Sequence, residues 1–418
     1  MITVEKALEI ILSESQDFGV EKIPFMESLG RVLKEDIGAD RDFPPFDRVS
    51  MDGIAIYYDT YKKGDITFPI ESIQAAGAEQ LSLKSQQNCI EVMTGAVVPK
   101  NADTVIPYEL VKIKDGEAEL ATDTIKQGQN IHRKGLDRKQ GDLLIKQNTI
   151  ISSAEIGVLA TVGKATVKVA KQPKVMIVST GDELVEVDKI PLNHQIRRSN
   201  VYTLVALLHE LKIQAETAHI NDDKAILKQK IEGYLLDYDV LLFSGAVSKG
   251  KFDFLPEILE ELGVEKQFHK VKQRPGKPFW FGTISPFGID SESRSIGRKK
   301  GVVNNRTTIF AFPGNPVSTF VGCLKYFYPW LQKSIGIQYV NEDNAILSEN
   351  FTFHPALTYF LQVRLQNKNG KLIATPLKGK GSGDLANLAD ADGFLELPAD
   401  KTEFMKGEAF PLIRYRPH

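Results

Sequence analysis

Two loops that end short apolar runs carry the hydroxyls, carboxylates and glycines that a ligand site needs. The loop Ser179–Leu184 ends the run that begins at Lys174, and the loop Ser244–Gly250 follows the run Val240–Phe243. Small residues allow backbone N–H groups to approach a phosphate closely. Each loop is also compatible with an ordinary turn. Because the chain lacks the Gly-x-x-x-x-Gly-Lys-Ser/Thr spacing, a P-loop nucleotide triphosphatase is not favoured.

Two Pro-Gly turns place cations and hydroxyls where an oxyanion could bind. The turn Arg274–Pro278 holds two cations around a rigid Pro-Gly pair, and the turn Phe312–Ser318 opens a helical segment. Both features suit the capture of an oxyanion. Proline at a helix start is also a common structural device, so two plain connectors remain the alternative.

Two segments nearer the N-terminus are dense in turn-forming residues, carboxylates and hydroxyls. They are Pro44–Gly53 and Met93–Ala96. An acidic turn is usually only a solvated loop, and composition alone does not distinguish that from a site.

The chemistry-bearing loops follow a pattern of strands that alternate with helices. Apolar runs predict strands, and helical periodicity predicts helices between them, over these segments in order: strand Lys174–Thr180, helix Val201–Leu211, strand Ile213–Ile220, helix Ala225–Leu236, strand Val240–Phe243 and helix Leu255–Leu262. This alternation indicates βαβ units and a mostly parallel sheet. Ligands of such sheets bind beyond the carboxyl ends of the strands, where both loops lie.

The remaining segments predict further domains of other kinds. Residues Val4–Leu12 have the spacing of an amphipathic helix, Ser152–Leu159 is helical, and the short apolar runs between Pro44 and Asp137 predict a small all-β domain. A helix is expected over Pro316–Ile335 and a C-terminal β domain from about Asn341, whereas Thr283–Thr308 is expected to be mainly an exposed loop.

Composition excludes several classes of protein. The 418 residues exceed one ordinary core, and 52 basic against 54 acidic residues give a formal charge of −2. No long-range attraction for nucleic acid or membrane is expected, so any anion site must be local. Cys89 and Cys323 lack metal-ligand spacing and predict buried reduced thiols. A cytoplasmic protein is expected, because no apolar run is long enough to span a bilayer.

Taken together in this order, the motifs resemble the MoeA family of molybdopterin molybdenumtransferases, whose relatives include the C-terminal region of gephyrin. The likeness covers essentially the whole chain, with departures at Leu136, Ala246 and Arg274. The motifs that carry it are Pro44–Asp47, Met51–Gly53, Met93–Ala96, Gly135–Asp137, Ser179–Leu184, Asp222–Asp223, Ser244–Gly250, Arg274–Pro278 and Pro313–Ser318.

The resemblance implies a multidomain fold of α/β and β parts. A molybdopterin-binding α/β domain with a mostly parallel sheet would span residues 171–338, and a C-terminal β-barrel would span 339–418. An inserted small β domain would span 44–137, and an elongated N-terminal helical region would comprise 1–43 and 138–170. It also implies a homodimer in which the inserted domain of one subunit faces the α/β and C-terminal domains of the other.

The implied reaction inserts molybdate into adenylylated molybdopterin, releasing AMP, in molybdenum cofactor biosynthesis. The residues expected to capture the oxyanion are Lys270, Arg274, Lys277, Pro278, Ser318, Arg364 and Ser382. Phosphate and pterin would rest on Ser179, Gly181 and Ser248. The catalytic carboxylates and hydroxyl would be Asp52, Thr94, Asp137, Glu183, Asp222 and Asp253, of which Glu183, Asp222 and Asp253 would also bind Mg²⁺, because hard oxygen ligands suit that ion.

Two alternative functions stay open at this point. A molybdopterin adenylyltransferase uses a similar α/β domain, although that family usually lacks the other domains. A non-catalytic gephyrin-like scaffold would use the same module to bind proteins. Expected partners are adenylylated molybdopterin, molybdate and a second copy of the chain, with hand-over to a molybdopterin adenylyltransferase or molybdoenzymes.

Overall fold

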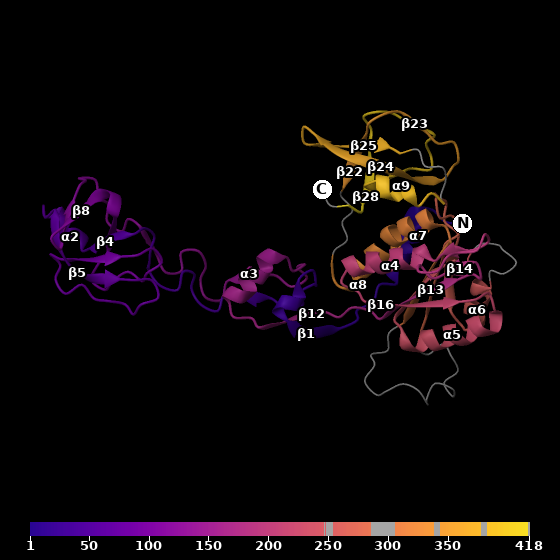
Figure 1. Cartoon of the computed structure of the whole chain (residues 1–418), viewed down its shortest axis with the longest axis horizontal. Coiled ribbons are helices and arrows are strands. Elements are labelled where there is room, and N and C mark those ends of the chain that lie inside the picture. Colours follow the sequence, from indigo (N-terminus) through magenta and orange to yellow (C-terminus); the bar gives the residue numbers. More distant parts are fainter. Residues whose placement is uncertain (246, 248–253, 286–305, 338–342, 378–382, 417–418) are drawn as a thin grey trace. The chain divides into compact units, whose positions relative to one another are not determined.

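The computed structural model describes residues 1–245, 247, 254–285, 306–337, 343–377 and 383–416. They form two compact units (Figure 1). The smaller unit comprises Glu35–Gln147 and Ser153–Ala165, and the larger unit comprises Met1–Lys34, Asn148–Ser152 and Thr166–His418.

The smaller unit is built on a six-stranded sheet. Its strand order is β7 (Thr104–Pro107), β4 (Gly53–Ile56), β6 (Cys89–Val92), β5 (Thr67–Gln74), β9 (Glu117–Leu120) and β8 (Val111–Lys114). Strand β4 is buried on both faces, with Ile54 and Ile56 in one apolar cluster and Ala55 in another. The unit also contains α2 (Tyr58–Lys62), η2 (Tyr108–Leu110), α3 (Ser153–Thr161), and the pairs β2 (Ile37–Gly38) with β11 (Leu143–Ile145) and β3 (Arg48–Val49) with β10 (Ile131–His132).

The larger unit contains the predicted α/β sheet. Four strands, β16 (Ala215–Ile220), β13 (Val175–Thr180), β17 (Val240–Ser244) and β21 (Thr307–Phe312), run parallel in that order. Strands β20 (Trp280–Ile284) and β18 (Glu265–His269) add an antiparallel edge. Strands β13, β17 and β21 are buried along their whole length because both faces of the sheet are covered. Helices α5 (Lys224–Asp237) and α6 (Leu255–Glu261) pack on one face, and α1 (Val4–Ser13) and α4 (Ser199–Glu210) pack on the other (Figure 1).

The C-terminal strands close into a small barrel. Strands β24 (Thr358–Lys368), β25 (Lys371–Pro376), β22 (Asn344–Leu347), β28 (Ala409–Arg414) and β26 (Gly393–Leu397) pair in turn, and β26 pairs back onto β24. Strand β19 (Gln273–Arg274), from the α/β region of the sequence, joins β24 in parallel. Arg274 ends β19 and Pro275–Pro278 follow it, so the turn Arg274–Pro278 lies where the barrel meets the α/β sheet.

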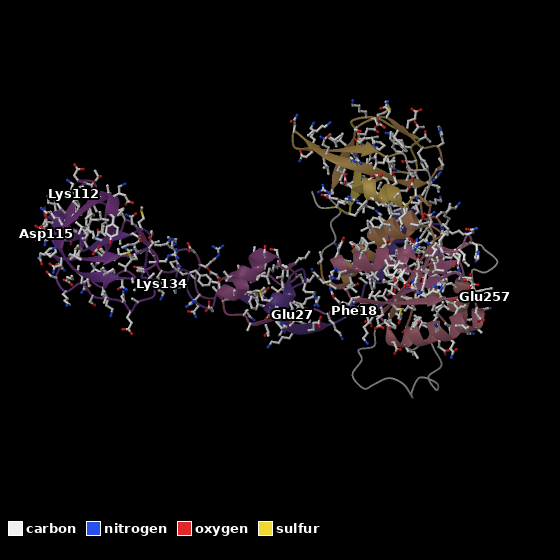
Figure 2. All side chains as sticks on the ribbon, in the orientation of Figure 1. Phe18, Glu27, Lys112, Asp115, Lys134 and Glu257 are labelled. Carbon is white, nitrogen blue, oxygen red and sulfur yellow. The ribbon has the colours of Figure 1, made fainter. Side chains whose placement is uncertain are left out.

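Short elements complete the larger unit. They are β1 (Val20–Pro24) paired with β12 (Thr166–Ala170), η1 (Phe25–Ser28), β14 (Leu184–Val185) paired with β15 (Ile196–Arg197), α9 (Ala386–Asp390), and β23 (Phe351–Thr352) paired with β27 (Glu403–Phe404). Figure 2 labels Phe18, whose ring lies edge-on against Trp330 at 6.0 Å between centroids.

The helix predicted over Pro316–Ile335 is confirmed, but it contains a change of helix type that the sequence did not predict. Three helical segments follow one another there: α7 (Pro316–Gly322), the π-helical turn η3 (Cys323–Phe327) and α8 (Tyr328–Ser334). Pro329 accounts for the change of pitch, because it cannot donate the backbone hydrogen bond that would continue an α-helix. The predicted strands and helices between Lys174 and Leu262 are confirmed, with bounds that shift by a few residues.

Most of the predicted loop Thr283–Thr308 lies outside the described residues, and its two ends belong to β20 and β21. Among the helices that the structure describes, none is long and apolar enough to cross a membrane.

A buried ion pair fastens η3 to the barrel. The Nζ atom of Lys325 lies 2.5 Å from Oε2 of Glu396 on β26, and the two side chains are only 7% and 12% exposed. Removing one partner of a buried pair leaves an uncompensated charge, whereas replacing both with apolar groups is often nearly neutral.

We therefore expect Lys325→Met to lower the free energy of unfolding by about 3–5 kcal/mol and Lys325→Met/Glu396→Leu to recover most of that loss. Urea denaturation followed by circular dichroism measures both. Lys6→Met, which removes the exposed pair Lys6–Glu9 on α1, serves as the control and should change little. Wild-type stability in Lys325→Met would contradict the assignment.

Candidate functional site

A cavity lies beyond the carboxyl ends of β13 and β17, where the sequence places the two polar loops. It is lined by Ser179, Thr180, Gly181, Glu183, Leu184, Ile196, Arg197, Arg198, Ser199, Asn200, Val201, Asp222, Ser244, Gly245, Gly314 and Pro316. We call it the strand-end cavity. Four predicted site residues, Ser179, Gly181, Glu183 and Asp222, therefore meet at one place, as the parallel strands require.

Gly181 has a backbone conformation that glycine alone adopts readily. Its φ is +130°, and a Cβ atom placed on it would lie 2.4 Å from Oε2 of Glu183. The Glu183 carboxylate therefore lies close to the Cα of Gly181, where a side chain would not fit. Gly245 has φ +111°, and its Cβ would lie 3.2 Å from the hydroxyl of Thr180, so the two loops approach each other closely.

Asn200 ties the loops of the strand-end cavity together, and sequence reasoning missed it. Its Nδ2 donates to Oγ of Ser244 over 2.9 Å and to the carbonyl oxygen of Gly314 over 2.8 Å. One amide therefore links the end of β17 to the turn after β21. The only signal in the sequence is a polar pair, Ser199-Asn200, at a helix start.

The hydroxyl of Ser179 contacts the neighbouring strand. The side chain is 2% exposed, and its Oγ lies 3.1 Å from Nδ1 of His219 and 3.4 Å from the carbonyl oxygen of Ala218, both on β16. These contacts fix the end of β13 against the edge strand. Direct binding of a ligand by Ser179 stays a prediction.

A second cavity lies beside the turn Arg274–Pro278. It is lined by Gln273, Arg274, Pro275, Gly276, Lys277, Pro278, Pro313, Gly314, Asn315, Ser318 and Leu357. We call it the turn cavity. It brings together Arg274, Lys277, Pro278 and Ser318, which the sequence predicted for oxyanion capture. Gly314 lines both cavities, so the two are adjacent.

Buried contacts fix the shape of the turn cavity. Gly276 has φ +86°, and a Cβ there would lie 3.6 Å from Cβ of Ser318. The side chain of Gln273, 1% exposed, donates from Nε2 to the carbonyl oxygen of Pro275 over 3.1 Å and accepts a hydrogen bond from the Tyr326 hydroxyl. The guanidinium of Arg274 lies 5.8 Å from the ring centroid of Phe353 in the barrel region.

The remaining oxyanion candidates lie apart from these linings or outside the described residues. Lys270 has φ +100° and bonds through its backbone to Phe279, and it does not line the turn cavity. Arg364 is exposed on β24, and its Nη2 donates to the carbonyl oxygen of Asp390 over 3.3 Å. The predicted roles of Ser248, Asp253 and Ser382 fall on residues that the structure does not describe.

The smaller unit holds the other predicted carboxylates. Oδ1 of Asp52 accepts hydrogen bonds from the backbone N–H of Thr94 at 2.6 Å and from its hydroxyl at 2.7 Å. These bonds lower the pKa of Asp52 and keep the exposed carboxylate ionised. Oδ1 of Asp137 lies 2.8 Å from Nε2 of His132. Nearby, Asp47 accepts from Arg133 and from the backbone of Lys134, which Figure 2 labels.

The described residues show no metal cluster, and both thiols are buried. Among the described residues, no group of three or more His, Cys, Asp or Glu side chains could hold a metal ion. Glu183 and Asp222 nevertheless line the same cavity. Cys89 and Cys323 are buried and free, as predicted, and burial raises the pKa of Cys89 to about 12.

The bonds from Thr94 predict a measurable titration of Asp52. Thr94→Val removes the hydroxyl and keeps the backbone N–H, so the pKa of Asp52 should rise part of the way to its ordinary value. Carboxyl ¹³C NMR titration of the full chain measures it, with the exposed Thr122→Val as the control variant. An Asp52 pKa that is already ordinary in the wild-type protein would refute this geometry.

Known proteins resemble the chain along its whole length. Residues 2–163 match a model described as MoeA N-terminal region (domain I and II), residues 176–333 a probable molybdopterin binding domain, and residues 344–415 a MoeA C-terminal region (domain IV). A molybdopterin molybdenumtransferase from Synechocystis is 40% identical over 99% of this chain and 100% of its own.

A Bacillus subtilis protein of the same name is 28% identical over 99% of this chain and 94% of its own. Two crystal structures of a molybdopterin biosynthesis MoeA protein from Pyrococcus horikoshii superpose with a TM-score of 0.80. They are 30% and 27% identical and cover 100% and 99% of this chain and 100% of their own. The multidomain fold expected from the sequence is thereby confirmed.

Proposed function

The chain belongs to the MoeA family of molybdopterin molybdenumtransferases, and from this premise we propose that it inserts molybdate into adenylylated molybdopterin with release of AMP. It is a transferase of molybdenum cofactor biosynthesis. The observation that supports the proposal most is the adjacency of the strand-end and turn cavities at Gly314. One offers hydroxyls, carboxylates and backbone amides, and the other offers two cations on a rigid turn.

The two substrates are both anions, so each needs its own site. Adenylylated molybdopterin would lie in the strand-end cavity, with its phosphates toward Ser179, Gly181 and the loop that includes Ser248. Molybdate would lie in the turn cavity, where Arg274 and Lys277 neutralise its charge. Pro278 and Ser318 would shape and donate to that site. The roles of Lys270, Arg364 and Ser382 in oxyanion capture stay predictions.

To cleave a phosphoanhydride, the protein mainly has to position the reacting groups and stabilise the negative charge on the phosphates. Lys277 and Arg274 keep molybdate next to the dithiolene sulfurs of the pterin. The loop amides near Gly181 and Gly245 would orient the phosphates while the two dithiolene sulfurs replace two oxygens of molybdate. One of these oxygens, transferred directly or through water, bonds to the adenylyl phosphorus as the anhydride P–O bond breaks and AMP leaves, and the other leaves as water with the two thiol protons. No nucleophilic side chain is required in this scheme.

A magnesium ion fits the carboxylates of the strand-end cavity. Mg²⁺ is commonly held by one or two carboxylates together with substrate phosphates, and Glu183 and Asp222 line the cavity from two loops. Asp253, beyond the described residues, is the third candidate. When bound, the ion would neutralise charge on the phosphate oxygens.

Dimerisation is the second part of the proposal. The candidates Asp52, Thr94 and Asp137 belong to the smaller unit, and those of the two cavities belong to the larger unit. We propose that in a homodimer the inserted domain, 44–137, contributes residues to the site formed by the α/β domain, 171–338, and the barrel domain, 339–418, of the partner subunit. The segments 1–43 and 138–170 would form the N-terminal region. Hand-over from this protein would be to a molybdopterin adenylyltransferase or to molybdoenzymes.

The turn cavity predicts a defect in molybdate binding. Lys277→Ala should raise the molybdate concentration for half-maximal AMP release about tenfold or more, because a charge-assisted contact is lost. Arg274→Lys keeps the charge and should stay active. Lys272→Ala, an exposed lysine beside the turn, is the control. An unchanged half-saturation in Lys277→Ala would show that the oxyanion binds elsewhere.

The dimer proposal predicts complementation between two inactive variants. Asp52→Ala and Lys277→Ala should each be poorly active, whereas mixed and reassociated subunits should recover about a quarter of wild-type activity, because each heterodimer regains one intact site. AMP release at limiting molybdate measures the recovery. Asp137→Ala should behave like Asp52→Ala. Failure to recover activity in heterodimers that native mass spectrometry detects would contradict shared sites.

A further inference from the structure

The strand-end cavity has a basic wall that none of the roles above uses. The wall is formed by Arg197, Arg198 and the first turn of α4, Ser199–Val201, all of which line the cavity. We call it the α4 wall. Opposite charges, Glu183 and Asp222, lie in the same cavity and belong to the loops after β13 and β16.

Arg198 is buried, and its hydrogen bonds are incomplete. The residue is 7% exposed, and its Nη1 donates to Oε1 of Glu186 over 2.6 Å. Its Nε is buried and has no hydrogen-bond partner within the described part of the chain. A buried N–H donor of a charged group that makes no hydrogen bond is costly, so Nε of Arg198 calls for an acceptor such as a bound anion or a water molecule.

Glu186 holds the guanidinium but is itself half exposed. Its side chain retains 48% of its accessible surface, and its Oε2 accepts a hydrogen bond from the Tyr202 hydroxyl over 3.1 Å. Tyr202 lies one turn into α4, and its ring centroid is 6.0 Å from the guanidinium carbon of Arg198. The carboxylate therefore orients Arg198 and neutralises it only in part.

The first turn of α4 adds backbone N–H donors to the α4 wall. This helix has twelve residues, no side chain caps its start, and its first turn contains no acidic residue. The amide of Asn200 is already engaged with Ser244 and Gly314. The leading N–H groups and the positive end of the helix dipole are therefore available to an anion in the cavity.

We propose that Arg198, together with the first turn of α4, binds a phosphate group, and that Glu186 orients Arg198 and competes with that phosphate for its guanidinium. The planar fork of Arg suits two oxygens of one phosphate. In the proposed reaction the ligand is the pyrophosphate of the adenylylated pterin, and that identification rests on the proposed function. The turn cavity, with Arg274 and Lys277, remains the separate site for molybdate.

The test is calorimetric titration of the full-length protein with inorganic pyrophosphate, and separately with AMP, at a fixed magnesium concentration. Arg198→Met should weaken binding about tenfold or more, because it removes a charge-assisted contact. Glu186→Gln should bind as tightly as the wild type or more tightly, because the competing charge is gone. A purely structural ion pair predicts instead that both variants weaken binding alike.

The chain offers a matched control in Arg31→Met. Arg31 is also largely buried, at 13% side-chain exposure, and pairs with the partly exposed Glu21, but it does not line the cavity. It should leave pyrophosphate binding unchanged. If Arg198→Met does not fold, as judged by its melting temperature, Arg198→Lys keeps a cation without the planar fork, and it should weaken binding several-fold.

Failure of this proposal and failure of the proposed function give different results. Wild-type pyrophosphate and AMP affinity in folded Arg198→Met, or equal weakening in Glu186→Gln, would overturn the phosphate role even if the protein releases AMP with molybdate. If the wild-type protein releases no AMP but Arg198→Met loses pyrophosphate binding, the phosphate site is supported and the proposed reaction is contradicted. The half-saturating molybdate concentration should be unchanged in Arg198→Met.

Discussion

Repulsion between two anions is the constraint on which this structure depends. Molybdate and the phosphates of an adenylylated pterin repel each other, and the repulsion grows as water leaves the site. A chain with a formal charge of −2 exerts no general attraction for either, so the compensating charge must be local. In the proposed sites the larger unit supplies it twice, at the turn Arg274–Pro278 and at the start of α4.

The fold brings these sites together by joining segments that are distant in sequence. Strand β19 leaves the α/β region to pair with β24 of the barrel, so the turn that follows it faces the loop after β21. Gln273 hydrogen-bonds the carbonyl oxygen of Pro275 in that turn and accepts a hydrogen bond from the buried Tyr326. Asn200 links the loop after β21 to the end of β17. Gly314 lines both cavities.

The sequence could predict the parts of the site that lie on regular strands. Loops that end parallel strands share one edge, and this rule was enough to bring Ser179, Gly181, Glu183 and Asp222 to one cavity. It could not predict that Gln273 and Arg274 form a barrel strand, because two residues carry no periodicity. The roles of Asn200 and Arg198 depend on tertiary contacts with Gly314 and Glu186, which no local pattern encodes. The π-helical turn before Pro329 escaped prediction because the apolar spacing around it still looks helical.

A crystal containing both molybdate and AMP will show whether the two anions occupy separate, adjacent sites. Anomalous diffraction at the molybdenum absorption edge locates the metal without reference to any assumed chemistry. We expect a molybdenum peak in the turn cavity, between Lys277 and Ser318, and AMP phosphate in the strand-end cavity beside Gly181 and the start of α4. A molybdenum peak among Glu183, Asp222 and Arg198, or AMP phosphate on the turn Arg274–Pro278, would contradict it.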